Sequence, residues 1–218
     1  GVFMDQALEL LPADYWRWYL TAYGPEHSDS AFTWEQFQSA TNKDLADVLG
    51  NFVNRIVKFT ESKFDGVVPE GGALTDVERD FQTRITQAVA EATAAFEAME
   101  FRKAAQAVRA AWVLGNEYLQ VAAPWTAFKT DPERAATAVR FALNLVALFA
   151  RLAAPILPFS APQIAASVGE TDLGWPSPDA AWLEAVPAGR AVAHQGVLFT
   201  KIEDAQVAEW AARFGGEG

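Results

Sequence analysis

The stretch that decides the fold reads NKDLADVLGNFVNR and covers residues 42–55. Its apolar residues recur at three- and four-residue steps, a spacing that places them on one face of an α-helix. The spacing continues toward the C-terminus, and this apolar face consists of Leu45, Val48, Leu49, Phe52, Ile56 and Phe59. Asn51, Arg55 and Lys58 fall on a different face. We therefore predict a long amphipathic helix that packs on one side and leaves a polar side free.

The polar side carries an amide and a guanidinium one helical turn apart, at Asn51 and Arg55. Together they present several hydrogen-bond donors and one acceptor in a fixed frame, which suits the polar edge of a nucleobase. The alternative is a solvated helix face on which Arg55 pairs with an acidic neighbour. From the residues alone, both interpretations stay open.

Helical periodicity extends over most of the chain, so the sequence predicts an all-α bundle. Ser, Thr or Asp residues with Glu or Gln three positions later mark helix starts at Thr33 and Thr75, and Asp131 followed by Pro132 marks another. The predicted helices cover about residues 5–11, 14–23, 33–64, 75–96, 101–122, 131–153 and 204–214. From Pro155 onward, prolines divide the chain into short pieces, and we expect a short strand at Val197–Ile202 in a tail that covers the bundle.

Composition limits the functions that the chain can have. The 218 residues are 51% hydrophobic, and the net charge of −11 argues against a general binder of nucleic-acid phosphates, so that any RNA contact must be local. With no Cys and only two widely separated His residues, we expect neither disulfides nor a metal site. No segment approaches the roughly 20 consecutive apolar residues of a membrane span, and no leader pattern opens the chain, so we expect a soluble protein with no membrane partner.

Trp125 follows Pro124 at a predicted helix break, where a large ring can project from the surface. Most Trp residues in helical proteins instead cap the core, and the residues alone favour that role here. Lys129 lies close enough along the chain to meet a phosphate beside such a ring. Asn54 and Asn116 have the commoner fate of helical Asn residues, which is to bridge backbone groups or to position others.

Several blocks of sequence, in this order, carry a family resemblance: DYWRWYL at 14–20, FTW at 32–34, NKDL at 42–45, GNFVNR at 50–55, APW at 123–125 and KIED at 201–204. Their order and spacing resemble the C-terminal half of methionyl-tRNA synthetases, which are class I aminoacyl-tRNA synthetases. The first block resembles class I synthetases in general. The Asn-Phe-Val-Asn-Arg block combined with a distant Ala-Pro-Trp is much more specific to methionine.

The resemblance implies three parts: a stem-contact region at residues 1–29, an anticodon-binding helix bundle at 30–159 and a wrapping C-terminal tail at 160–218. It implies that Asn51, Arg55 and Trp125 contact the CAU anticodon of methionine tRNA, chiefly its first base. In this arrangement the aromatic ring stacks on a base, while the amide and the guanidinium read its edge. We assign supporting roles to Asn54, Lys58, Asn116 and Lys129.

The resemblance also implies what the whole enzyme does, namely ligating methionine to its tRNA with ATP in the cytoplasm. The catalytic signatures of the family, a His-x-Gly-His block and a Lys-Met-Ser-Lys-Ser loop, do not occur in this chain. We therefore expect the chain alone to be non-catalytic, without a cofactor or metal, and to work with the N-terminal catalytic domain of the same enzyme as a monomer.

Two other classes remain open at this stage. One is a helical protein-interaction module with no RNA role, which the acidic net charge and the aromatic-rich first segment favour. The other is the equivalent anticodon-binding bundle of a related class I synthetase. Binding to stem-loops with different anticodons separates them.

Overall fold

A computed structural model describes residues 2–26 and 31–214, and the predicted all-α fold is confirmed there. The helices, in chain order, are α1 (Met4–Leu10), α2 (Ala13–Tyr23), α3 (Trp34–Thr41), the π-helix η1 (Asn42–Gly50), α4 (Asn51–Lys63), α5 (Asp76–Glu97), α6 (Phe101–Ala122), α7 (Pro124–Thr130), α8 (Pro132–Ala153), α9 (Ala161–Ala166), the 3₁₀-helix η2 (Ala180–Glu184) and α10 (Asp204–Phe214). Within the described residues no strand forms, and Val67 pairs with Ala191 in an isolated bridge.

The predicted helix starts are confirmed by their hydrogen bonds. The Thr33 hydroxyl accepts from the backbone N–H of Gln36 at 3.2 Å, and the backbone N–H of Thr75 donates to the Glu78 carboxylate at 2.9 Å. The Asp131 carboxylate accepts from the backbone N–H of Arg134 at 3.0 Å. These side chains satisfy backbone donors that the first turn of a helix leaves unpaired.

The long helix predicted over residues 33–64 is present as α3, η1 and α4 in direct succession, but its middle part is not α-helical. Nine residues of η1 form a π-helix, in which each turn is wider than in an α-helix. Two side chains of α6 bind this segment: Arg109 pairs with the Asp44 carboxylate at 2.5 Å, and Asn116 donates to the Val48 carbonyl at 3.0 Å. Local propensity does not reveal the wider turns, because the contacts that accompany them come from a helix distant in sequence.

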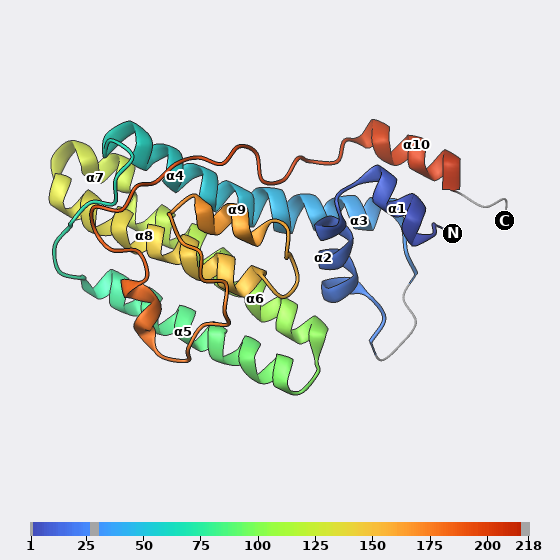
Figure 1. The fold of residues 1–218 in the computed structure, drawn as a ribbon, viewed down its shortest axis with the longest axis horizontal. Helices are drawn as coiled ribbons and strands as arrows, with labels where there is room; N and C mark the ends of the chain where they lie inside the picture. The colour runs from blue at the N-terminus through green and yellow to red at the C-terminus, as the bar shows by residue number, and fades with distance from the viewer. Residues whose placement is uncertain (1, 27–30, 215–218) are drawn as a thin grey trace.

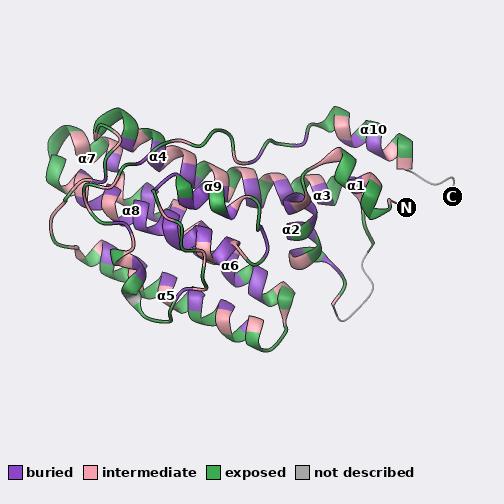
Figure 2. Cartoon of the chain, viewed as in Figure 1, coloured by how far each residue is buried: buried purple, intermediate pink, exposed green. Residues whose placement is uncertain are grey.

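The core is built around α8, most of which is buried (Figure 2). By length and composition α8 would pass for a membrane span, which the sequence reasoning did not anticipate, but 83% of its apolar window is buried inside the bundle. The close packing of α6 depends on Gly115, where a Cβ atom would lie 2.6 Å from the Phe149 ring on α8 and 3.0 Å from the Phe52 ring on α4. The apolarity of α8 therefore follows from its central position in the bundle.

The predicted apolar face of the long helix is confirmed. Leu45, Leu49, Phe52 and Ile56 are fully buried, and the remaining two members of that face pack partly against the core. The helices α1, α2, α3 and α10 gather at one end of the molecule and α7 lies at the other, so the long helix connects the two ends (Figure 1). The predicted boundary between residues 29 and 30 lies outside the described residues, and the three-part division stays a prediction.

The strand predicted at Val197–Ile202 was wrong. This segment runs extended beside the long helix (Figure 1). The backbone N–H and C=O groups of that helix are already paired within the helix, so they cannot form the hydrogen bonds that a β-strand needs from a neighbour. Side chains bind its backbone instead: the Asn42 carboxamide makes two hydrogen bonds to Ile202, and the Tyr15 hydroxyl accepts from the backbone N–H of Thr200 at 2.8 Å. The alternation of residue types reflects a segment with one buried side, and Phe199 is 6% exposed.

Candidate nucleic-acid interface

A shallow groove of about 550 Å³ lies between the long helix on one side and α6 and the start of α7 on the other. We call it the recognition groove, and it is lined by Asp47, Val48, Asn51, Arg55, Val113, Asn116, Gln120 and Trp125. The three side chains predicted to contact a base therefore meet in one surface depression, although Trp125 is 70 residues from Arg55 in sequence.

The backbone between α6 and α7 determines where the indole lies. Ala123 ends α6 in the left-handed region, with φ of 40°, and Pro124 occupies the first position of α7. This reversal places Trp125 in the first turn of α7, where its ring is half-buried. Its edge-on contact with Phe59 at 6.2 Å ties the ring to the core, so the indole both packs inward and lines the groove.

The Arg55 guanidinium lies over the Trp125 ring, with its central carbon 4.4 Å from the ring centroid. Such a cation–π contact holds the guanidinium plane without using its N–H donors. Across the described residues the side chain of Arg55 forms neither a hydrogen bond nor an ion pair, and the side chain of the exposed Asn51 forms no hydrogen bond. An acidic partner for Arg55, the alternative considered from sequence, is not found there. The groove thus presents oriented, unused donors.

Asn116 lines the recognition groove but uses its amide nitrogen within the fold. It donates to the carbonyls of Val48 at 3.0 Å and Trp112 at 3.2 Å. Its carbonyl oxygen is buried and has no hydrogen-bond partner among the described residues. Asn116 therefore connects α6 to the π-helix just ahead of Asn51, in line with the positioning role expected of a helical Asn.

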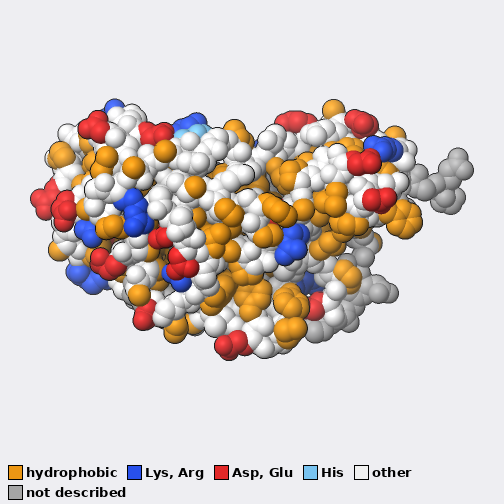
Figure 3. Space-filling view, viewed as in Figure 1, with side chains coloured by type: hydrophobic (Ala, Val, Ile, Leu, Met, Phe, Trp, Pro, Cys, Tyr) orange, Lys and Arg blue, Asp and Glu red, His pale blue; other side chains and the backbone are white. Residues whose placement is uncertain are grey.

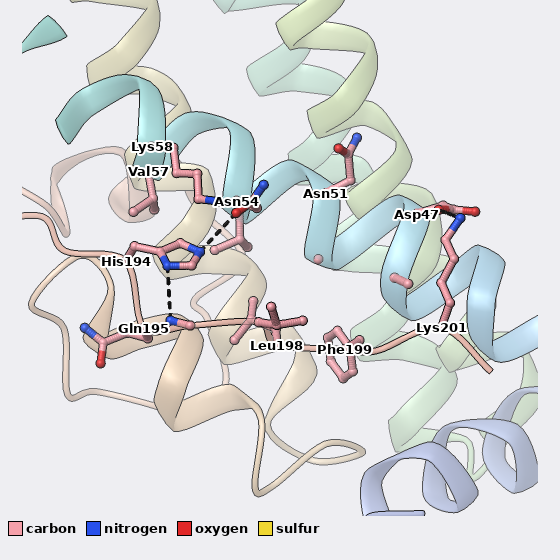
Figure 4. Close-up of a pocket in the computed structure, with 15 residues that line it drawn as sticks. Asp47, Asn51, Asn54, Val57, Lys58, His194, Gln195, Leu198, Phe199 and Lys201 are labelled. Carbon is pink, nitrogen blue, oxygen red and sulfur yellow. Dashed lines mark hydrogen bonds and ion pairs between the residues drawn. The ribbon is translucent and has the colours of Figure 1, made fainter. Parts of the chain in front are cut away.

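The structure separates Asn54 and Lys58 from the recognition groove. Both line a second depression, on the side of α4 that faces the C-terminal segment, and Asn54 contacts His194 there (Figure 4). Lys129 is exposed near the end of α7 and lines neither depression. Sequence reasoning grouped Asn54 with Asn51 because they are three residues apart, yet only Asn51 lines both depressions, whereas Asn54 does not reach the recognition groove.

Sequence reasoning missed Asp47, Val113 and Gln120 as residues lining the recognition groove. Helical spacing could have indicated two of them, since Asp47 precedes Asn51 by one helical turn and Gln120 follows Asn116 by one turn. The carboxylate of Asp47 pairs with Lys201 at 2.6 Å, so much of its charge is compensated inside the protein.

A buried polar cluster lies at the other end of η1. The fully buried Asp44 carboxylate accepts hydrogen bonds from Trp18 at 3.1 Å, from the Tyr23 hydroxyl at 2.7 Å and from Arg109. Burial, followed by the hydrogen bond to Asp44, raises the pKa of Tyr23 to about 12. Asp44 is thus the structural partner of Arg109. The described residues contain no group of three or more His, Cys, Asp or Glu side chains able to hold a metal ion.

Comparison with known proteins places this geometry in context. The family model described as the anticodon binding domain of methionyl tRNA ligase matches residues 68–218, and that of class I (M) tRNA synthetases matches residues 1–57. Methionine–tRNA ligases from Caulobacter sp. (strain K31) and Ruegeria sp. (strain TM1040) are 59% and 55% identical over 99% of this chain. The chain spans 38% of the length of either relative.

Solved structures agree with the sequence comparisons. The apo form of Mycobacterium tuberculosis methionyl-tRNA synthetase superposes with a TM-score of 0.83 at 24% identity, covering 93% of this chain and 41% of that one. The same enzyme in complex with methionyl-adenylate gives a TM-score of 0.80 at 25% identity, covering 88% of this chain and 38% of that one. The helical arrangement is therefore shared with these structures.

Proposed function

Because this chain belongs to the methionyl-tRNA synthetase family, we propose that it recognises the CAU anticodon of methionine tRNA through the recognition groove. The observation that carries the proposal is the convergence of Asn51, Arg55 and Trp125 on one surface depression with their donors unused. Buried side chains use their donors inside the protein, whereas the unpaired donors of this groove are open to a partner that displaces water.

The chemistry of cytosine matches these groups. Its Watson–Crick edge presents two acceptors and one amino donor, the guanidinium of Arg55 offers only donors, and the carboxamide of Asn51 adds an acceptor. Guanine at the same position presents two donors on that edge, which face the donors of Arg55 and leave buried groups unpaired. The exposed part of Trp125 adds stacking, which is tolerant of sequence, so discrimination arises from Asn51 and Arg55.

The family also supports a proposal for the whole protein, namely that the full enzyme ligates methionine to its tRNA with ATP in the cytoplasm. In that enzyme this chain supplies the anticodon contact. The chemistry lies in the catalytic domain, which precedes this part in the relatives. The chain itself needs no cofactor and acts as a monomer. Its parts are the stem-contact region at 1–29, the bundle at 30–159 and the tail at 160–218.

The test is direct binding of the 218-residue chain to anticodon stem-loops, followed by fluorescence anisotropy. A CAU loop should bind more tightly than an otherwise identical GAU loop. Tighter binding to the GAU loop, or to a loop with the anticodon of another class I synthetase, would reassign the bundle to a related enzyme. Equal or absent affinity for every loop would contradict the RNA role and leave a protein-interaction module.

A further inference from the structure

A second depression of about 340 Å³ lies between α4 and the extended segment 194–201, and we call it the tail groove (Figure 4). Its rim carries Asn51, Asn54, Lys58 and His194, and its apolar wall includes Leu198 and Phe199. We propose that the tail groove binds a backbone phosphate of the same RNA loop whose first anticodon base enters the recognition groove. This inference rests on the proposed function and adds a contact that carries affinity without base specificity.

His194 orients the carboxamide of Asn54. The Nδ1 atom of His194 accepts from the backbone N–H of Gly196 at 3.2 Å, so the ring carries its proton on Nε2. Nε2 then donates to Oδ1 of Asn54 at 3.0 Å. Because Oδ1 is held by the ring, the amide nitrogen of Asn54 is directed away from it, and both of its N–H donors lack a partner among the described residues. The result is a preoriented pair of donors at the rim.

Lys58 supplies the charge. It follows Asn54 by one helical turn, and both side chains line the tail groove (Figure 4). Lys201, the other cation of this groove, is already paired with Asp47 at 2.6 Å. Lys58 has no ion pair among the described residues. The carboxylate of Glu61, three residues after Lys58, accepts from the backbone N–H of His194 at 2.8 Å. An ammonium beside two free amide donors is a set of groups suited to a phosphate.

The tail groove adjoins the recognition groove, so one RNA strand can reach both. Asp47 and Asn51 line both grooves, so a ridge of η1 and α4 separates them and consecutive parts of one RNA strand can straddle it. At about 340 Å³ the tail groove lies at the lower end of the range of ligand sites, which is about 300–1,000 Å³. Its apolar wall fits the face of a ribose. The net charge of −11 disfavours phosphate contacts spread over the surface, so a phosphate contact has to be local.

The test compares Lys58→Gln with Lys63→Gln in the 218-residue chain. Lys63 ends the same helix, is also exposed, and lies outside both grooves near the Phe128 ring. Affinity for the CAU and GAU stem-loops is measured over a series of salt concentrations. We expect Lys58→Gln to bind both loops about two- to fivefold more weakly at low salt and Lys63→Gln to match the unsubstituted chain. The slope of log affinity against log salt should become shallower by about 0.7 for Lys58→Gln alone.

A second measurement locates the contact on the RNA. Loops carrying a neutral methylphosphonate at one position should lose affinity at a particular site, and at that site Lys58→Gln should cause no further loss. His194→Gln keeps an N–H donor for Asn54 and should retain the salt slope, whereas His194→Ala should bind more weakly.

The outcomes separate the two proposals. A chain that binds CAU and GAU loops equally overturns the proposed function. A chain that discriminates between the loops, while Lys58→Gln keeps the unsubstituted salt slope, overturns only the phosphate site. A change in the ratio of CAU affinity to GAU affinity caused by Lys58→Gln would also overturn it, because a contact with the RNA backbone does not depend on the identity of the base.

Discussion

The two ends of the π-helix η1 carry polar residues in opposite states. At Asp44 the carboxylate is fully buried and its acceptors are occupied by Trp18, Tyr23 and Arg109. At Asn51, seven residues later, the side chain is exposed and forms no hydrogen bond within the described part of the chain. Both residues belong to the same quoted stretch of sequence, yet only one of them contributes its polar groups to the fold.

This difference separates folding from recognition on one continuous helix. A buried charge is tolerated only when its partners are in place, so the Asp44 cluster ties α2 and α6 to η1. Donors left free on a half-exposed surface contribute little to stability and remain available to a ligand. Substitutions at the two ends should therefore change different measured quantities.

The largest expected effect is that of Asp44→Ala on stability. Removing the carboxylate leaves Arg109 without its counter-ion and takes the acceptor from the buried Trp18 N–H and from the partly exposed Tyr23 hydroxyl. The free energy of unfolding at neutral pH should fall by about 3–5 kcal/mol, measured by urea denaturation. Asp44→Asn, which keeps an acceptor, should lose less and keep its preference for the CAU loop.

Asp47→Ala is the matched control, because Asp47 lies one turn further along and its carboxylate is about half exposed in the ion pair with Lys201. Its substitution should cost at most about 1 kcal/mol of stability. If the two variants were equally stable, the buried Asp44 would contribute no more to folding than the half-exposed Asp47, which would contradict the structural role of the Asp44 cluster.

Trp125→Ala should affect binding more than folding. The indole supports the Arg55 guanidinium and offers a stacking surface, so its removal should weaken binding to the CAU loop by about 1–3 kcal/mol. Because the ring is only half-buried, the folded state should persist, which circular dichroism checks. Loss of folding without a specific loss of binding would return Trp125 to the role of a core cap.

Asn51→Ala and Arg55→Ala should each lower discrimination at the first anticodon base more than at the other two. Loss of one hydrogen bond to the base should cost about 0.5–1.5 kcal/mol of affinity for CAU, with a smaller loss for GAU. Measurement uses loops changed at one anticodon position at a time. Unchanged discrimination in both variants would rule out their assignment.

The smallest expected effect is the pH dependence of the stability that Tyr23 contributes through its hydrogen bond to Asp44. Because folding raises the pKa of Tyr23 from 10.0 to about 12, its contribution is complete below pH 10 and is lost as the pH rises toward 12. Tyr23 is 37% exposed, so solvent screening limits this contribution to about 1 kcal/mol. The stability difference between the unsubstituted chain and Tyr23→Phe should shrink between pH 10 and pH 12 in urea titrations, and a constant difference would contradict the coupling to Asp44.

Much of the helical fold was predictable because its signals are local. Apolar spacing and capping residues such as Thr33, Thr75 and Asp131 specify where helices begin and which face they bury, and the structure agrees. The π-helix was not predictable, because the side chains that bind η1 belong to α6. The strand expected at Val197–Ile202 failed for a similar reason, since pairing depends on what lies beside a segment and here that neighbour is a helix.

In the candidate site, too, local spacing predicted some features and the packing of distant segments decided the others. Helical spacing alone relates Asn51 to Arg55, because residues four apart share a face whatever surrounds them. The approach of Trp125 to Arg55, the separation of Asn54 from Arg55 and the contact between Asn54 and His194 arise only when α7 and the C-terminal segment pack against α4. Order along the chain dictates which groups a helix presents, whereas the packing of distant segments decides which of those groups remain unpaired, since each hydrogen bond inside the protein consumes a donor.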